Sequence, residues 1–127
     1  MSEDTPAPFI VIRTPAAAKA AKMDPYDAAL ALVGVVHGIV ETATTRFYLK
    51  DRLDRAASGL VFELGRAANE VPMLRWKSYR NAQAHASDVA TVIDILVHQQ
   101  AAAAADLERA RTMIRELIAA IAPRCAG

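Results

Sequence analysis

The side chains in this sequence that could do chemistry are its histidines, its cysteine and a run of basic residues between positions 46 and 80. His37 precedes Glu41 by four residues and His98 follows Asp94 by four, so each pair shares a helix face. A di-iron carboxylate bundle needs Glu-x-x-His pairs that point into its core, and no histidine here follows a glutamate at that spacing. We therefore expect no metal and no cofactor, with a small metal- or ligand-binding bundle kept as an alternative.

Nucleophilic catalysis has little support in the sequence. Cys125 stands close to the C-terminus, in an expected tail of residues 123–127 where a catalytic thiol would lack an electropositive surround. Ser58, Ser78 and Ser87 belong to no motif that would activate a hydroxyl, and no glycine-rich phosphate loop is present. The sequence thus predicts a protein that is not an enzyme.

One region of the sequence favours nucleic-acid binding. Residues 46–80 carry eight basic side chains against four acidic ones, in the company of Trp76 and Tyr79. Cations contact phosphates, and aromatic rings stack on unpaired bases. The candidate contacts are Arg46, Lys50, Arg52, Arg55, Arg75, Lys77 and Arg80. The competing interpretation, which we favour, is that Arg52, Arg55 and Arg75 pair with neighbouring acids while the two aromatic residues pack in the protein or at a subunit interface.

The composition sets the size and class of the protein. The 127 residues have room for one domain, and 54% of them are hydrophobic while only 6% are aromatic. Alanine-rich chains of this kind favour close helix packing. A formal charge of +1 gives no general argument for a polyanionic partner. The single cysteine, the absence of a leader and the shortness of the apolar run over 28–40 lead us to expect a cytoplasmic protein with no membrane association.

The first 23 residues differ from the rest. Pro6, Pro8 and Pro15 exclude a continuous helix, and the apolar run Phe9-Ile10-Val11-Ile12 lies between them. We expect an extended N-terminal arm over 1–23. Its apolar run either docks in a groove of its own protein or of a neighbouring subunit, or it belongs to an undocked tail.

The first expected helix begins at Asp24, a good N-cap, with Pro25 at the first position and Asp27 in the first turn. It ends near Thr42 to Thr45, because threonine is a poor helix former. Its predicted core stripe is Ala29, Val33, Val36, Val40 and Ala43, and this stripe is widened by Leu30, Leu32, Val35 and Ile39. A helix this apolar needs a central position or contact with another subunit.

Three more helices follow. One spans about 46–69 with Leu53, Ala57, Leu60, Leu64, Ala67 and Val71 on one face, and its Gly59 and Gly65 are expected points of close helix approach. A turn at Asn69 to Pro72 separates it from the next helix. A single helix over 72–122 would be about 75 Å long, so we predict a tight turn around 98–101. The four expected helices and their short connections predict an all-α, up-down-up-down antiparallel four-helix bundle over residues 24–122.

Part of the sequence resembles a known protein family. The residues that carry the resemblance are Phe47, Leu49, Leu53, Arg55-Ala56-Ala57, Leu60, Leu64, Tyr79, Ala82, Ala84 and Asp88. They are similar to positions in the small bacterial four-helix-bundle family named after proteins encoded by intervening sequences of large-subunit ribosomal RNA genes. The accessory variability proteins of diversity-generating retroelements are related to it. The sequence departs from the family at Glu63-Leu64-Gly65-Arg66-Ala67, where the family has Asn-Ile-Ala-Glu-Gly, and at Ala84-His85, where it has Gly-Ser.

The resemblance implies a bundle that assembles into a homo-oligomeric ring, typically a pentamer. The retroelement branch is strongly basic and works with a reverse transcriptase and nucleic acid, which a near-neutral chain argues against. We expect a non-enzymatic scaffold or interaction protein. Its expected oligomer interface comprises Phe9, Ile10, Val35, Ile39, Trp76 and Tyr79. The alternative is an adaptor that binds RNA, DNA or the ribosome through the basic residues of 46–80.

Overall fold

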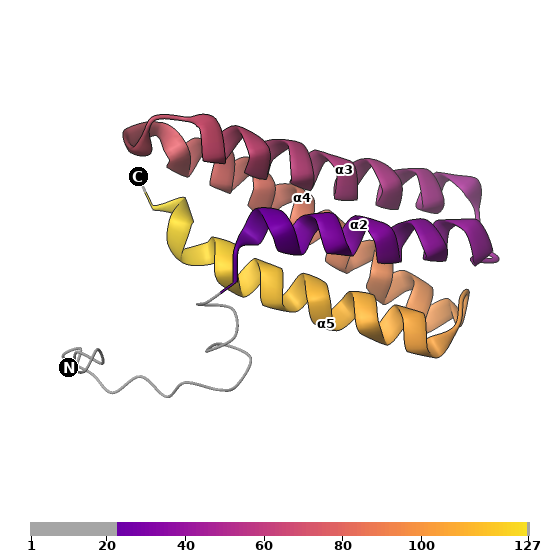
Figure 1. Cartoon of the computed structure of the whole chain (residues 1–127). Coiled ribbons are helices and arrows are strands. Elements are labelled where there is room, and N and C mark those ends of the chain that lie inside the picture. Colours follow the sequence, from indigo (N-terminus) through magenta and orange to yellow (C-terminus); the bar gives the residue numbers. More distant parts are fainter. Residues whose placement is uncertain (1–22, 127) are drawn as a thin grey trace, which may run out of the picture.

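The computed structural model describes residues 23–126, and these residues form an all-helical protein (Figure 1). Four helices pack together: α2 (Pro25–Thr42), α3 (Phe47–Asn69), α4 (Arg75–Gln99) and α5 (Ala104–Ile121). Two short 3-10 helices, η1 (Pro72–Leu74) and η2 (Ala122–Cys125), follow α3 and α5. The predicted all-α class with four packed helices is confirmed. The expected arm lies outside the described residues except for Met23.

Helix α2 starts as the sequence predicts. The Asp24 side chain accepts a hydrogen bond from Tyr26 N at 3.2 Å, and Pro25 occupies the first turn. An aspartate in this position satisfies one of the amide groups that have no partner inside the helix. None of the helices in the described part of the chain is both long and apolar enough to cross a membrane.

The buried face of α2 differs from the predicted stripe. Leu32 and Ile39 are fully buried, whereas Val33 and Val40 are half-buried at the edge of the core. Because each residue turns a helix by about 100°, Val33 and Val40 lie one step to the side of Leu32 and Ile39. The fully buried stripe therefore runs through Ala29, Leu32, Val36 and Ile39, and Val33 and Val40 pack against its edge.

Helix α3 packs against both α2 and α4. Its predicted apolar face is buried from Leu53 to Ala67, but Val71 lies beyond the helix end and is 55% exposed, which corrects its assignment to the core. Pro72 begins η1, and the residue before a proline is disfavoured in a helix. The core is centred on large, fully buried side chains from all four helices: Leu32, Ile39, Leu53, Leu60, Ile93, Leu96, Ile114, Leu117 and Ile121.

The turn predicted around 98–101 is present. Gln100 takes a left-handed conformation with φ 52°, and Ala101 N donates to Leu96 O at 3.0 Å while Gln100 N donates to Val97 O at 3.1 Å. This is the Schellman pattern, which satisfies carbonyl groups at the end of a helix. The reversal lets α5 pack against α4 and α2.

The α2–α3 and α4–α5 connections are bonded to each other at one end of the protein. Thr44 N donates to Ala101 O at 2.8 Å, and Thr45 Oγ1 donates to Gln99 Oε1 at 2.8 Å. The start of α2, the α3–α4 turn and η2 lie at the other end, on the left of Figure 1. The two ends therefore differ: one is closed by hydrogen bonds between connections, and the other gathers three separate parts of the chain.

Candidate functional site

The predicted nucleic-acid contacts do not form one surface. Arg46 and Lys50 lie at the start of α3, whereas Arg75, Lys77 and Arg80 lie at the start of α4, beyond the far end of α3. A helix of 23 residues is about 35 Å long, so the sequence cluster is split between the two ends of the molecule. Only the group on α4 lies beside Trp76 and Tyr79.

Two of the predicted contacts pair with acids, as the favoured interpretation expected. Arg55 Nε lies 3.0 Å from Asp51 Oδ2, and Arg52 Nη2 lies 3.6 Å from Asp88 Oδ2 on α4. Both arginine side chains are more than half exposed, and exposed ion pairs contribute only about 0–1 kcal/mol. The pairs reduce the local positive field without locking these side chains in place.

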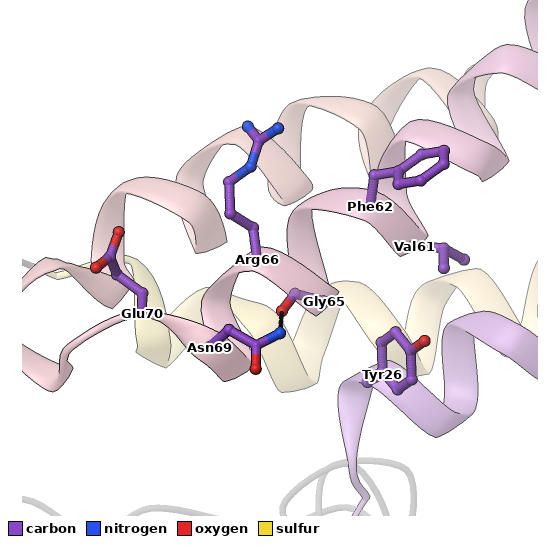
Figure 2. Close-up of a pocket in the computed structure, with 7 residues that line it drawn as sticks. All are labelled: Tyr26, Val61, Phe62, Gly65, Arg66, Asn69 and Glu70. Atoms are coloured by element: carbon purple, nitrogen blue, oxygen red, sulfur yellow. Dashed lines mark hydrogen bonds between the residues drawn. The ribbon is translucent and has the colours of Figure 1, made fainter.

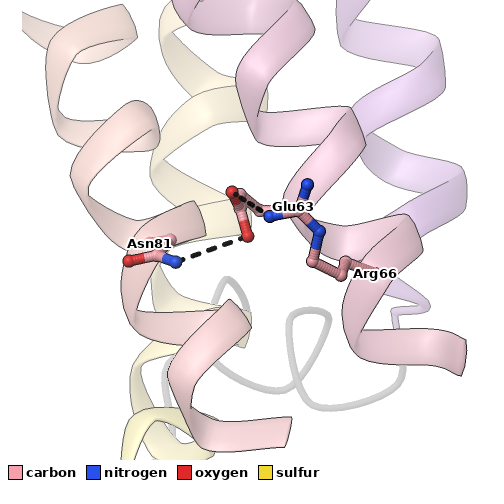
Figure 3. Close-up of polar contacts among 3 residues, drawn as sticks. All are labelled: Glu63, Arg66 and Asn81. Atoms are coloured by element: carbon pink, nitrogen blue, oxygen red, sulfur yellow. Dashed lines mark hydrogen bonds and ion pairs between the residues drawn. The ribbon is translucent and has the colours of Figure 1, made fainter. Parts of the chain in front are cut away.

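A third ion pair lies within α3, and its acid also accepts a hydrogen bond from α4. Figure 3 shows Glu63 between Arg66 and Asn81: Arg66 Nη1 donates to Glu63 Oε2 at 3.2 Å, and Asn81 Nδ2 donates to Glu63 Oε1 at 3.5 Å. The Glu63 side chain is only 14% exposed, and both of its oxygens accept a bond. Buried carboxylates need such partners. Arg66 therefore already has an acidic partner on its own helix.

A fourth cation, Arg124 of η2, lies close to the basic residues of α4. We call Arg75, Lys77, Arg80 and Arg124 the basic end. Lys77 Nζ and Arg80 Cζ lie 5.7 and 5.5 Å from the centre of the Trp76 ring, and Arg124 Cζ lies 5.9 Å from that of Tyr79. Cations at this distance from an aromatic face are attracted by its quadrupole.

The basic end has no neutralising acid among the described residues: no carboxylate there lies within ion-pair distance of its four cations. The expected pairing of Arg75 with an acid was wrong, since Arg75 Nε donates to the backbone oxygen of Glu70 at 3.0 Å. Arg124 was missed because residues 123–127 were expected to form a tail. Residues 122–125 continue α5 into η2, which packs on α4.

A pocket of about 500 Å³ opens at the basic end. Its lining residues are Pro72, Met73, Arg75, Trp76, Tyr79, Arg124 and Ala126. Close by, Cys125 Sγ lies 3.4 Å from Gln83 Oε1, and burial raises the pKa of the thiol while the charge of Arg80 opposes this rise. A thiol with a raised pKa is a weak nucleophile near neutral pH. The pocket offers cations and aromatic faces for binding an anion.

Ile39 was expected at a subunit interface and is instead fully buried in the core of its own protein. The long side chain points inward from α2 because it falls on the stripe of Leu32 and Val36. The expected interface residues Val35, Trp76 and Tyr79 are half-buried. Phe9 and Ile10 lie outside the described residues.

Large apolar side chains outside the expected interface are exposed instead, and one of them, Leu30, was expected in the core stripe of α2, so that expectation was wrong. Phe62 is 72% exposed on α3, Leu30 is 46% exposed on α2, and Met73 is 81% exposed in η1. The available signal was that Phe62 lies off the stripe of Leu60 and Leu64. A phenylalanine in that position faces solvent or a partner.

A groove of about 470 Å³ runs between α2 and α3 (Figure 2). We call it the α2–α3 groove, and its lining residues are Tyr26, Val61, Phe62, Gly65, Arg66, Asn69 and Glu70. Tyr26, Val61 and Phe62 lie at one side of Figure 2, and the polar side chains lie at the other. A β-carbon built on Gly65 would be 3.4 Å from Tyr26 Cε1, which is an ordinary van der Waals distance, so this contact does not require the predicted close helix approach at Gly65.

The pairs considered for metal binding find other partners. His37 Nε2 lies 3.6 Å from Asp54 Oδ1, and Asp94 Oδ1 lies 3.3 Å from Arg111 Nε. Within residues 23–126, no three histidine, cysteine, aspartate or glutamate side chains come together in a way that could hold a metal ion. These side chains make ordinary surface pairs between neighbouring helices.

The chain has no match among protein-family models, curated proteins or solved structures. The interpretation of the sites consequently depends on the geometry described above.

Proposed function

We propose that this chain is a non-enzymatic, homo-oligomeric interaction protein that works in the cytoplasm. In this proposal its helices run up-down-up-down, and copies of the bundle form a ring, typically a pentamer, as the family that the sequence resembles would imply. The observation that carries the proposal is the exposure of large apolar side chains on two separate parts of the surface.

The first part is the outer face of α2. Leu30 is 46% exposed, and β-carbons built on Gly34 and Gly38 would meet nothing within 4 Å, so another helix could approach this face closely. Half-buried Val35 borders it. Among the described residues nothing packs over the two glycines, which supports the use of this face against a second copy.

The second part is the α3–α4 turn. Val71, Met73 and Leu74 are 55%, 81% and 38% exposed, and Trp76 is half-buried beside them. Large exposed apolar patches mark interaction sites in soluble proteins. Two different patches that meet head to tail generate a closed ring when the rotation between copies closes. The α2 face and the turn are suited to such an interface.

Light scattering on the full-length protein tests the proposal. Five copies of the 13.7 kDa chain would give about 69 kDa, and Met73→Ser or Leu30→Ser should lower the mass. Phe47→Ser is the matched control, because Phe47 is 77% exposed at the other end of α3. A monomer at micromolar concentration would defeat the proposal.

A second candidate function is binding of single-stranded nucleic acid at the basic end. It is favoured by the four cations that have no carboxylate partner among residues 23–126 and that surround Trp76 and Tyr79. Cations that contact phosphates and rings that stack on bases are the usual elements of such sites. Repetition around a ring would multiply the positive charge.

A salt-dependent gel shift with generic single-stranded RNA tests this candidate. Arg75→Glu with Lys77→Glu should abolish a shift that is present at low salt. Arg52→Glu with Arg55→Glu is the control, since both residues already pair with acids and should change the shift less. The absence of a shift at low salt with the unaltered protein would remove this candidate.

A further inference from the structure

The α2–α3 groove lies beside the point where the described chain begins. Tyr26 lines the groove and stands three residues after Met23, the first described residue. Met23 packs against the core, so it fixes the place from which the preceding residues depart. The chain before Met23 therefore joins the described part of the protein next to this groove.

One side of the groove is apolar and exposed to solvent. Phe62 is 72% exposed and Tyr26 is 37% exposed, and Val61 lies between them along the wall. An occupant with apolar side chains and an extended backbone would remove these side chains from water.

The residues before Met23 contain one segment of that chemistry. Phe9-Ile10-Val11-Ile12 is the longest apolar run before Met23 without alanine or proline, and Pro8 and Pro15 stand on either side of it. Ten residues separate Ile12 from Met23. At about 3.3–3.6 Å per residue they span at most about 36 Å, which is about the length of α3. The run can therefore reach any part of the groove.

A tether of this length also decides between the run of the same chain and that of a second copy. Short linkers give effective concentrations in the millimolar range, whereas a copy outside the same assembly is present at micromolar concentration in the tests described above. Both copies carry the same run, so its chemistry is equal and only concentration separates them. The same chain is therefore the favoured source.

We infer that Phe9-Ile10-Val11-Ile12 dock in the α2–α3 groove of their own chain and cover Tyr26 and Phe62. The inference does not depend on the proposed assembly, which uses the outer face of α2 and the α3–α4 turn. Docking in this position leaves the α3–α4 turn uncovered.

Paramagnetic relaxation on the full-length protein tests the inference. A nitroxide label is attached to Thr14→Cys in a Cys125→Ser background, so that only the arm carries a thiol. The expected result is a loss of more than half of the amide signal of Val61, Phe62 and Gly65. The amide signals of Thr44 and Ala101, at the closed end, should keep their intensity and serve as the internal control.

Two further samples make the result decisive. Phe62→Ser and Ile10→Asp should each restore the groove signals, whereas Phe47→Ser, an equally exposed phenylalanine at the other end of α3, should not. In a mixture of isotope-labelled protein without the nitroxide and unlabelled protein with it, the groove signals should persist. Full groove signals in the first sample, or losses of the same size in the mixture, would overturn the inference. A monomeric mass by light scattering would defeat the proposed assembly alone.

Discussion

Gly59 of α3 lies against the ring of His85 on α4. A β-carbon built on Gly59 would be 2.7 Å from Cε1 and 2.8 Å from both ring nitrogens of His85, closer than real β-carbons approach other atoms. The sequence predicted a close helix approach at this glycine, and the structure confirms it. The absence of a side chain at Gly59 is therefore what allows α3 and α4 to meet around the half-buried histidine.

Gly59→Ala tests this contact. Alanine favours a helix over glycine by about 1 kcal/mol, but overpacking costs about 1–3 kcal/mol, so we expect net destabilisation. Adding His85→Ala should reverse the sign, because the clash then disappears and only the helix preference remains. Urea unfolding of the two single variants and the double variant measures the coupling. If Gly59→Ala alone stabilises the protein, the ring moves aside freely.

Leu60 is fully buried one residue after Gly59, in contrast to exposed Phe47 on the same helix. We expect Leu60→Ala to lower the free energy of unfolding by about 2–5 kcal/mol, through lost burial and the cavity left behind. Phe47→Ala should change it by less than about 0.5 kcal/mol, because the ring is 77% exposed. Thermal and urea unfolding measure both. Similar losses for the two variants would contradict the assigned core.

Gln100 holds a left-handed backbone with φ 52°, which glycine adopts without the steric penalty of other residues. Gln100→Gly should therefore stabilise the protein by up to about 1 kcal/mol. Gln99→Gly is the comparison, and it should destabilise because it puts glycine inside α4 and removes the hydrogen bond from Thr45 Oγ1. Denaturation midpoints of the two variants should move in opposite directions.

Asp27 gives a pH-dependent prediction. The charge of Asp24 raises the pKa of the Asp27 carboxyl, with smaller contributions from their side-chain hydrogen bond and from desolvation. A raised pKa in the folded state means that the stability contributed by this group is present below its unfolded pKa and is lost as the pH rises through its folded pKa. Asp24→Asn should lower the pKa of Asp27 toward its ordinary value and keep the cap.

Carbon-13 shifts of the Asp27 carboxyl, followed through the acid range, measure that pKa directly. Urea midpoints over the same range should vary less with pH in the Asp24→Asn variant. An unchanged Asp27 titration in this variant would show that another group causes the shift.

The helix boundaries were predictable because local chemistry sets them. Asp24 and Pro25 begin α2, Pro72 follows α3, and Pro123 follows α5, each acting within a turn of its own position. The register of α2 was not predictable. Val33 and Leu32 are both apolar, and a helix that is apolar on most sides gives periodicity no means to choose between them.

The candidate site shows a similar limit. Residues 46–80 are contiguous in sequence, but α3 carries Arg46 and Arg75 to opposite ends of the protein. The ion pair of Arg52 with Asp88 and the position of Arg124 over Tyr79 join residues that are distant in sequence. Spacing along a single helix contains no information about such contacts.

The hydrogen bond between Thr44 and Ala101 has a practical consequence for attaching reporters. It joins two connections that are 57 residues apart in sequence. An insertion after Thr44 would disturb this contact between them and would therefore report on folding. An insertion between Glu70 and Val71 leaves that bond intact and falls beside the groove and the exposed turn. Inserted at these two places, the same reporter distinguishes a protein that has lost its fold from one that has lost its partner.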